Sequence, residues 1–141
     1  MSQDFIFPVL LVRLKPDDLA KRIQEGRFGP QKLKMLYCKR KFNLHTLIFL
    51  VEGDLQSYVV TGCACGFCEG VGHCGAPTVQ KIEEVLLETK EAGFSVIKTG
   101  NLTESMDILV YITAWLKIAA EDASCDFSVG FFAFISKLIY C

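Results

Sequence analysis

The chain lacks the features that direct a protein into or across a membrane. Its first residues, MSQDFIFPVLLV, carry an aspartate where a secretory signal peptide has basic residues, so no signal peptide is predicted. The apolar stretch FSVGFFAFISKLIYC has fifteen residues and contains Lys137, whereas a membrane-spanning helix needs about 20 apolar residues. We therefore expect no membrane contact. We also expect the seven cysteines to be free thiols or metal ligands in a reducing compartment, not disulfides.

The chain also has almost no net charge, but its charges are unevenly distributed. Between Arg13 and Lys41, ten Lys or Arg residues stand against three Asp or Glu residues, whereas the remainder of the chain has five against thirteen. A segregated basic segment is the electrostatic pattern that a phosphate backbone requires, and a solvated helix face has the same pattern. With 141 residues, of which 51% are hydrophobic and 22% charged, the composition predicts one globular domain with its own core.

Residues 16–36 predict a basic helical hairpin. Pro16 at a first helical position, with two aspartates in the turn that follows, favours a helix that ends at Gly26. A second helix is expected to start at Gly29-Pro30. In this second helix, Leu33 and Leu36 are expected to face inward, and Lys32 and Lys34 outward.

A continuous apolar run at residues 5–12 predicts a strand that is covered on both faces. A second continuous apolar run at residues 46–51 and the segment 94–99 predict two further strands. Apolar residues at helical spacing predict a helix between Thr78 and Gly93 and another after a cap at Asn101 or Thr103. The order strand, helix, helix, strand, loop, helix, strand, helix predicts an α/β fold with a central sheet flanked by helices. The expected inward residues are Val79, Ile82, Val85, Leu86 and Thr89 in the first of these helices, and Met106, Leu109, Ile112, Thr113 and Leu116 in the second.

Two acidic residues end the second apolar run, in the sequence Glu52-Gly53-Asp54. Open α/β sheets usually bind their ligands at the carboxyl ends of their strands. Carboxylates at such a position fit either groups that support a site or side chains that solubilise the strand end, and we favour the second interpretation.

Residues 55–77 form a glycine- and cysteine-rich segment that interrupts the regular pattern. Four cysteines with an adjacent histidine, His73, supply enough soft ligands for a tetrahedral zinc ion, although their spacing lacks two similar Cys pairs. The alternative is a flexible insertion. The possible zinc ligands are Cys63, Cys65, Cys68 and Cys74.

Several short motifs recur in a fixed order along the chain. Asp17-Asp18-Leu19 is followed by Gly26-Arg27-Phe28 and Gln31-Lys32, then by Glu52-Gly53-Asp54, and then by GFSVIKT at residues 93–99 with Glu104-Ser105. These motifs resemble ERKxxDDL, GRFxxQKxRL, a strand ending in EGD, GFxVxRT and an acidic-Ser pair in the catalytic chains of crossover junction endonucleases, which belong to the XPF superfamily of structure-specific nucleases. The resemblance covers roughly residues 13–116, with a gap at the cysteine-rich segment.

The resemblance implies a restriction-endonuclease-like nuclease core, expected here to be incomplete, within residues 1–120. Residues 55–77 would be an insertion loop, and residues 121–141 are an unassigned apolar tail. In the family, a hydrated magnesium ion lies between acidic side chains and the scissile phosphate, and the ERK lysine helps to position water. By resemblance, Asp18 is a catalytic and magnesium-binding residue and Arg13 is a catalytic residue that forms an ion pair. The residues expected to bind DNA are Arg27, Gln31, Lys32 and Lys34.

The chain departs from the family pattern at the residues that carry the chemistry. Val12 and Leu14 stand where ERK has its glutamate and lysine, and the upstream GD motif would have to precede Met1. Because loss of one positioned acid-base residue costs about 10²- to 10⁴-fold in rate, we expect this chain to be weak or inactive as a nuclease alone. No helix-hairpin-helix module follows, so the chain is expected to be a fragment, a variant transcript or a diverged copy.

Three functions are consistent with these patterns. The first is a magnesium-dependent, structure-specific DNA endonuclease that cleaves flaps, forks and Holliday-type junctions in nuclear DNA repair and recombination, as a heterodimer with a non-catalytic partner chain of the XPF superfamily. The second is a non-catalytic member of the family that keeps a DNA-binding or partner-binding surface. The third is a binding module stabilised by zinc at the cysteine-rich segment.

Overall fold

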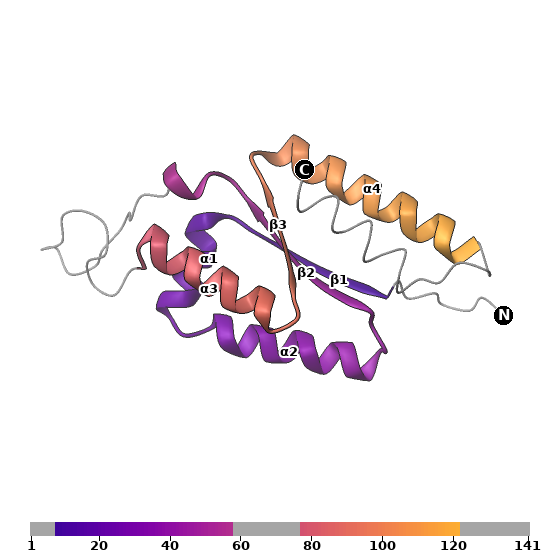
Figure 1. Cartoon of the computed structure of the whole chain (residues 1–141), viewed down its shortest axis with the longest axis horizontal. Coiled ribbons are helices and arrows are strands. Elements are labelled where there is room, and N and C mark those ends of the chain that lie inside the picture. Colours follow the sequence, from indigo (N-terminus) through magenta and orange to yellow (C-terminus); the bar gives the residue numbers. More distant parts are fainter. Residues whose placement is uncertain (1–7, 58–76, 122–141) are drawn as a thin grey trace, which may run out of the picture.

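The computed structural model describes residues 8–57 and 77–121, which form a small parallel sheet with helices on both faces (Figure 1). The observed order of elements confirms the predicted succession and the α/β class. In chain order, the elements are β1 (Val9–Leu14), α1 (Pro16–Gln24), α2 (Phe28–Lys41), β2 (Thr46–Glu52), the short 3₁₀ helix η1 (Leu55–Ser57), α3 (Val79–Glu91), β3 (Ser95–Thr99) and α4 (Leu102–Glu121).

The three described strands are parallel and lie in the order β1-β2-β3. Parallel strands require a long crossover connection, which α1 and α2 provide between β1 and β2, and α3 provides between β2 and β3. In the register, Leu14 lies beside Val51 and Glu52 lies beside Thr99. The carboxyl ends of all three strands therefore meet at one edge of the sheet, which we call the carboxyl edge.

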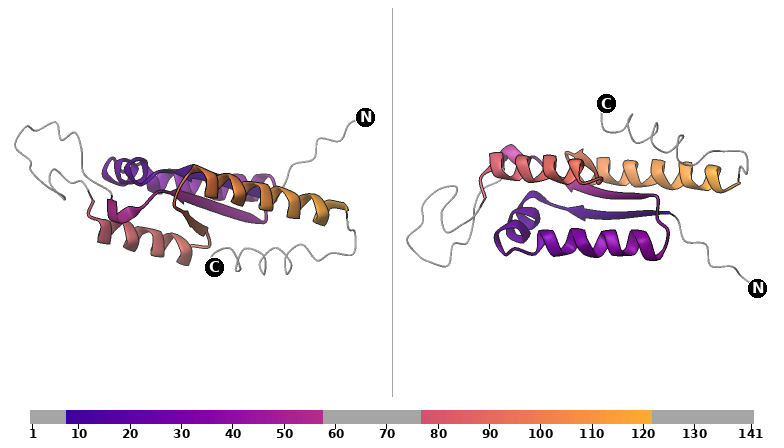
Figure 2. Two further views of the ribbon diagram at one scale, coloured as in Figure 1. Left: turned by 90° about the horizontal axis from the view of Figure 1, so that it is seen from above. Right: turned by 60° about the horizontal axis from the view of Figure 1, so that its bottom comes forward.

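The side chains of β2 alternate between two hydrophobic clusters. Leu47, Phe49 and Val51 pack with residues of α1, α2 and α3, whereas Ile48 and Leu50 pack against α4. The ribbon views agree, because α2 and α3 lie on one face of the sheet and α4 lies on the other (Figures 1 and 2). Burial on both faces explains why β2 is a continuous apolar run instead of an alternating one.

Phe49 occupies the centre of the larger cluster. Its ring centroid lies 5.2 Å from that of Phe28 in α2 and 5.4 Å from that of Phe94, which directly precedes β3. Tilted aromatic pairs at these separations contribute about 0.5–1.5 kcal/mol each beyond the burial of their area. The three rings therefore tie α2 to the middle of the sheet.

The first strand differs from its predicted form. β1 begins at Val9 and ends at Leu14, and its residues 9–12 are only half-buried. Among the described residues β1 has a single neighbouring strand, so it is an edge strand there. Its side chains still pack on both faces of the sheet, Leu10 and Val12 against the larger cluster and Val9 and Leu11 against the smaller one. Residues 5–7 of the predicted strand, the tail at 122–141 and most of the predicted insertion, residues 58–76, lie outside the described residues.

The inward face of α2 was predicted only in part: Leu36 is half-buried and packs against the larger cluster, but Leu33 does not face inward. The helix begins at Phe28, before Gly29-Pro30, and Phe28 and Met35 are its buried residues. Met35 follows Phe28 by two helical turns and so shares its face, whereas Leu33 points away and is 68% exposed.

The faces of α3 and α4 were predicted with unequal success. In α3 the expected residues Ile82, Val85, Leu86 and Thr89 are buried and Val79 is half-buried. In α4, Ile112 and Leu116 are buried as expected, Leu109 is half-buried, and Met106 and Thr113 are exposed. The rotation of α4 follows from Ser105, which is fully buried at the start of the helix. None of the described helices is both long and apolar enough to cross a lipid bilayer.

Candidate functional site

The carboxyl edge brings together polar residues that are far apart in the sequence. Arg13 is the penultimate residue of β1, and Glu52 and Thr99 are the last residues of β2 and β3. Ser105 reaches the same edge from the first turn of α4. A polar cluster at this position corresponds to the usual ligand-binding edge of an open α/β sheet.

Arg13 and Glu52 form a two-point ion pair. The Arg13 Nε atom donates to Glu52 Oε1 at 3.0 Å, and Arg13 Nη2 donates to Glu52 Oε2. The Glu52 side chain is 6% exposed and that of Arg13 is 41% exposed, so the carboxylate faces the protein interior and the guanidinium covers it. Both carboxylate oxygens of Glu52 thus have a cationic donor, which is the arrangement that a buried charge requires.

This pairing shifts both ionisation equilibria in favour of the charged forms. Hydrogen bonds from Arg13, and then from Ser105, lower the pKa of Glu52 against the opposing effect of burial. The hydrogen bond to Glu52 raises the pKa of Arg13, and the negative charge of Asp18 adds to this effect. The pair is therefore a permanent feature of the edge at neutral pH.

The interpretation of Glu52 as a strand-end solubiliser is wrong. The residue continues the buried face of β2 because the sheet and α4 enclose the strand to its last position. Asp54 differs: it is exposed, and its Oδ1 atom accepts a hydrogen bond from the Gln56 amide at 2.9 Å, as in an Asx-turn.

Thr99 and Ser105 connect β3 to α4. Their hydroxyl oxygens are 2.6 Å apart, and both side chains are buried. Asn101 caps α4 by accepting a hydrogen bond from the Glu104 amide at 2.9 Å, and Glu104 Oε2 accepts one from the Gly100 amide at 2.5 Å. These bonds confirm Asn101 as the cap and fix the start of α4 against the carboxyl edge.

The turn after β2 touches the start of α1. Gly53 has φ +117°, a conformation that side chains rarely adopt, and its amide donates to the Thr99 carbonyl at 2.8 Å. A Cβ atom at position 53 would lie 3.1 Å from the Cδ atom of Pro16. Pro16 is the first residue of α1, as predicted, so this glycine allows α1 to begin close beside the end of β2.

The two residues predicted to be catalytic lie at the same edge. Asp18 is exposed in the first turn of α1, close enough to Arg13 for its charge to affect that guanidinium. Arg13 itself is engaged with Glu52. Sequence reasoning expected an ion pair for Arg13 and placed Glu52 at the carboxyl end of a strand, but it did not identify Glu52 as the partner of Arg13 or assign a role to Thr99 and Ser105.

The acidic residues at the carboxyl edge differ in how available they are to a magnesium ion. Both oxygens of Glu52 are held by Arg13, which leaves Asp18 as the expected ligand. Among residues 8–57 and 77–121, no three side chains of His, Cys, Asp or Glu lie close enough together to hold a metal ion. The possible zinc ligands Cys63, Cys65, Cys68 and Cys74 lie outside the described residues.

The residues predicted to bind DNA are spread over the α1–α2 hairpin. Arg27 lies in the turn between the helices, is 60% exposed and forms an ion pair with Glu25. Gln31 accepts a hydrogen bond from Arg22 Nη1 at 2.6 Å, which ties α2 to α1. Lys32 is half-buried with its Nζ atom 5.0 Å from the centroid of the Phe28 ring, and Lys34 is exposed. Arg27 and Lys34 are thus the more accessible members of this set.

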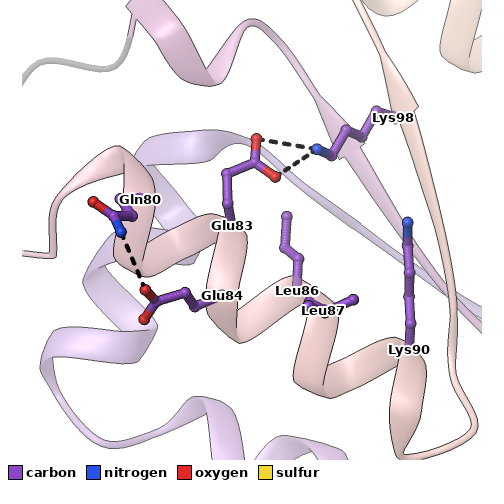
Figure 3. A pocket seen from close by; sticks show the side chains of 7 residues that line it. All are labelled: Gln80, Glu83, Glu84, Leu86, Leu87, Lys90 and Lys98. Carbon is purple, nitrogen blue, oxygen red and sulfur yellow. Dashed lines mark hydrogen bonds and ion pairs between the residues drawn. The ribbon is translucent and has the colours of Figure 1, made fainter.

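A shallow hollow of about 360 Å³ lies between α3 and β3 (Figure 3). Lys98 bridges it by an ion pair to Glu83 at 2.8 Å, and Gln80 donates to Glu84 at 3.5 Å. The first of these contacts connects β3 to α3, and the second lies within α3. None of the residues predicted to be functional lines it.

Comparison of the chain with models of protein families and with curated proteins found no match.

Proposed function

We propose that this chain is a DNA-binding α/β domain of the structure-specific endonuclease type, as its resemblance to the XPF superfamily implies. Its substrates would be branched DNA: flaps, forks and Holliday-type junctions handled in nuclear repair and recombination. A non-catalytic chain of the same superfamily would be its partner in a heterodimer. Cleavage would depend on magnesium, and this chain alone would cleave weakly or not at all.

One observation carries the proposal: residues from separate blocks of the resemblance are neighbours. Arg13, from the block that resembles ERK, binds Glu52, from the block that ends in EGD, and its guanidinium is influenced by Asp18 of the DDL block. Gln31 of the QK block is bonded to Arg22 in the helix that DDL begins. Motifs retained for a shared site are expected to be close together in this way.

The finer fold assignment, a restriction-endonuclease-like core, belongs to the same proposal. Parallel strands joined by helical crossovers, with acidic and basic groups at the carboxyl edge, are consistent with it.

The charge of the hairpin supports binding to a phosphate backbone. α2 contains five Lys or Arg residues and no Asp or Glu. Each phosphate that a basic residue neutralises releases condensed counterions, which makes the affinity strongly dependent on salt. The exposed positions of Arg27 and Lys34 allow such contacts without rearrangement of the core.

The expected weakness of cleavage has a local cause. Val12 and Leu14 cannot ligate a metal or activate water, and Glu52 is committed to Arg13. Asp18 remains the residue that the resemblance assigns to magnesium.

Binding of the purified chain to a fluorescent flap substrate tests the proposal. We expect binding in the presence of a chelator, weakening steeply as NaCl rises, and little cleavage after magnesium is added. Arg27→Gln and Lys34→Gln should weaken binding to all DNA forms, whereas Lys90→Gln, an exposed lysine on α3, should have little effect. Failure to bind any DNA, or equal losses in all three variants, would contradict the proposal.

A further inference from the structure

The outer face of α2 carries large apolar side chains that are exposed and take no part in the packing of the core. We define this face as Leu33, Lys34, Tyr37, Arg40 and Lys41, together with Phe42, which directly follows the helix; all six side chains are exposed. Tyr37 is 64% and Phe42 is 50% exposed. Isolated exposed apolar residues are ordinary on protein surfaces, but two aromatic rings and a leucine on one helix face form a patch.

The ammonium group of Lys41 lies close to both aromatic rings. The Lys41 Nζ atom lies 5.9 Å from the centroid of the Tyr37 ring and 5.6 Å from that of Phe42, so one ammonium group serves both. Lys34 and Arg40 lie on the same face, and α2 contains no carboxylate to neutralise them. The patch therefore combines aromatic surface with positive charge that no acidic residue of α2 neutralises.

The rings are presented by a rigid support. Phe28 and Met35 anchor the opposite face of α2 in the core. At the helix end, Asn43 adopts a left-handed conformation with φ 52°, and the Leu44 amide donates to the Lys39 carbonyl at 2.9 Å. This is the hydrogen bond of a Schellman cap, and it fixes the backbone at Phe42.

We propose that the outer face of α2 binds unpaired DNA, with bases stacked on Tyr37 and Phe42 and phosphates contacted by Lys34, Arg40 and Lys41. The inference rests on the proposed function and specifies which part of a branched substrate this face takes: a single-stranded arm. Proteins that bind single strands combine a basic track with aromatic rings, because every base offers a face for stacking and every phosphate a charge. In a duplex the bases are already stacked on each other, so the rings distinguish the two DNA forms.

The complementary charge favours a nucleic acid over an apolar protein partner. A purely apolar partner would leave the cations of this face without counter-charges, whereas a DNA strand supplies both bases and phosphates at short intervals. An anionic lipid surface has the same sign of charge, and the experiment separates it by the requirement for bases.

Fluorescence anisotropy with matched oligonucleotides tests the inference. The probes are a single-stranded oligonucleotide of about 12 nucleotides, within the range one binding module covers, and an abasic strand of equal length with the same phosphates. At one fixed salt concentration, the complete chain should bind the base-containing strand more tightly than the abasic strand. Tyr37→Ala and Phe42→Ala should each weaken the first interaction roughly 5- to 100-fold and leave the second nearly unchanged.

Two further variants control for loss of folding and for non-specific apolar contact. Tyr37→Phe keeps the ring and should bind the base-containing strand within about twofold of the unmodified chain, because stacking is retained. Leu87→Ala removes a comparably exposed apolar side chain that belongs to α3 and not to the outer face of α2, and should change neither affinity.

The outcomes are distinguishable from failure of the proposed function. Equal affinity for base-containing and abasic strands, or an unaltered affinity in Tyr37→Ala, overturns the inference, while binding of a flap substrate keeps the proposed function. Binding to vesicles of anionic phospholipid, with none to the oligonucleotides, overturns the inference in favour of a lipid surface. Absence of binding to any DNA overturns both.

Discussion

The carboxyl edge of the sheet and the outer face of α2 use basic residues in opposite ways. At the edge, Arg13 is bound through two nitrogen atoms to Glu52, and this buried carboxylate neutralises the positive charge of Arg13. On α2, Lys34, Arg40 and Lys41 lie on a helix without a single acidic residue. The charge of Arg13 is neutralised by a residue of the same protein. The charges on the outer face of α2 can instead be neutralised by another molecule.

The difference shows that a count of basic residues is a poor guide to a binding surface. Ten Lys or Arg residues between residues 13 and 41 suggested one continuous basic region. Within it, Arg13 is held by the buried Glu52 and Arg22 by Gln31. Arg27 has an exposed partner, Glu25, and Lys41 at the end of α2 lies beside aromatic rings. Pairing, and not number, determines which of these charges a phosphate can reach.

The largest expected effect is on the free energy of unfolding, and it compares a substitution on the inner face of α2 with one on its outer face. Phe28→Ala should lower the free energy of unfolding by about 3–5 kcal/mol, because the ring is 4% exposed and packs against Phe49. Tyr37→Ala should change it by about 0.5 kcal/mol or less, because the ring is largely in solvent. Urea denaturation followed by circular dichroism measures both values. Similar losses in the two variants would show that the outer face is part of the core.

The next effect compares two arginines that each have a carboxylate partner. Arg13→Ala leaves Glu52 buried without its cation and should destabilise the fold clearly. Arg27→Ala removes an exposed pair with Glu25 and should cost about 0.5 kcal/mol or less. The combined variant Arg13→Met, Glu52→Leu should be more stable than Arg13→Ala alone, because it removes the uncompensated charge. If Arg13→Ala and Arg27→Ala lowered the free energy of unfolding equally in urea titrations, the pair at the carboxyl edge would be no more important for stability than the exposed pair.

A third test uses pH to detect the ionised Glu52. The folded protein holds the pKa of this carboxyl below its ordinary value of 4.5 because Arg13 and Ser105 donate hydrogen bonds to it. Its contribution is therefore fully present above that ordinary value and is lost as pH falls through the lower folded pKa. We expect Glu52→Gln to show a shallower loss of stability than the unmodified chain between about pH 5 and pH 3, measured by urea titration at each pH. Asp54→Asn, at an exposed position of the same turn, is the control and should leave the slope nearly unchanged.

The smallest effect on stability is expected at Arg40, which is exposed on α2. Arg40→Gln should alter the free energy of unfolding by about 0.5 kcal/mol or less. In DNA binding, loss of one phosphate contact should reduce the slope of log affinity against log salt by about one. Anisotropy titrations at several NaCl concentrations give this slope. An unchanged slope would place Arg40 outside the DNA contact.

Much of the fold was accessible from the sequence because the local signals agreed with one another. The apolar run before Glu52, the proline at the start of α1 and the spacing of Ile82, Val85 and Leu86 each predicted the element that forms. The α/β class followed from their order. These features depend on neighbours in the sequence, which is why they could be read directly.

The errors concern features set by distant contacts. Which side of α2 faces inward depends on Phe28 meeting Phe49 in the sheet, and helical spacing alone allowed Leu33 instead. The rotation of α4 depends on the bond between Ser105 and Thr99. Burial of Glu52 depends on Arg13, thirty-nine positions earlier. A usable signal was present for Glu52, since it directly continues six residues of a strand enclosed on both faces.

The contact between Gly53 and Pro16 has a consequence for how the acidic first turn of α1 can vary. Since even one added carbon at position 53 would press on the proline ring, the first turn of α1 cannot move closer to the end of β2. Because position 53 carries no Cβ atom, the first turn of α1, which contains Asp17 and Asp18, can lie close to the end of β2. A bulkier residue at position 53 would therefore displace the start of α1, and with it the carboxylate of Asp18 relative to Arg13, without altering any charged group.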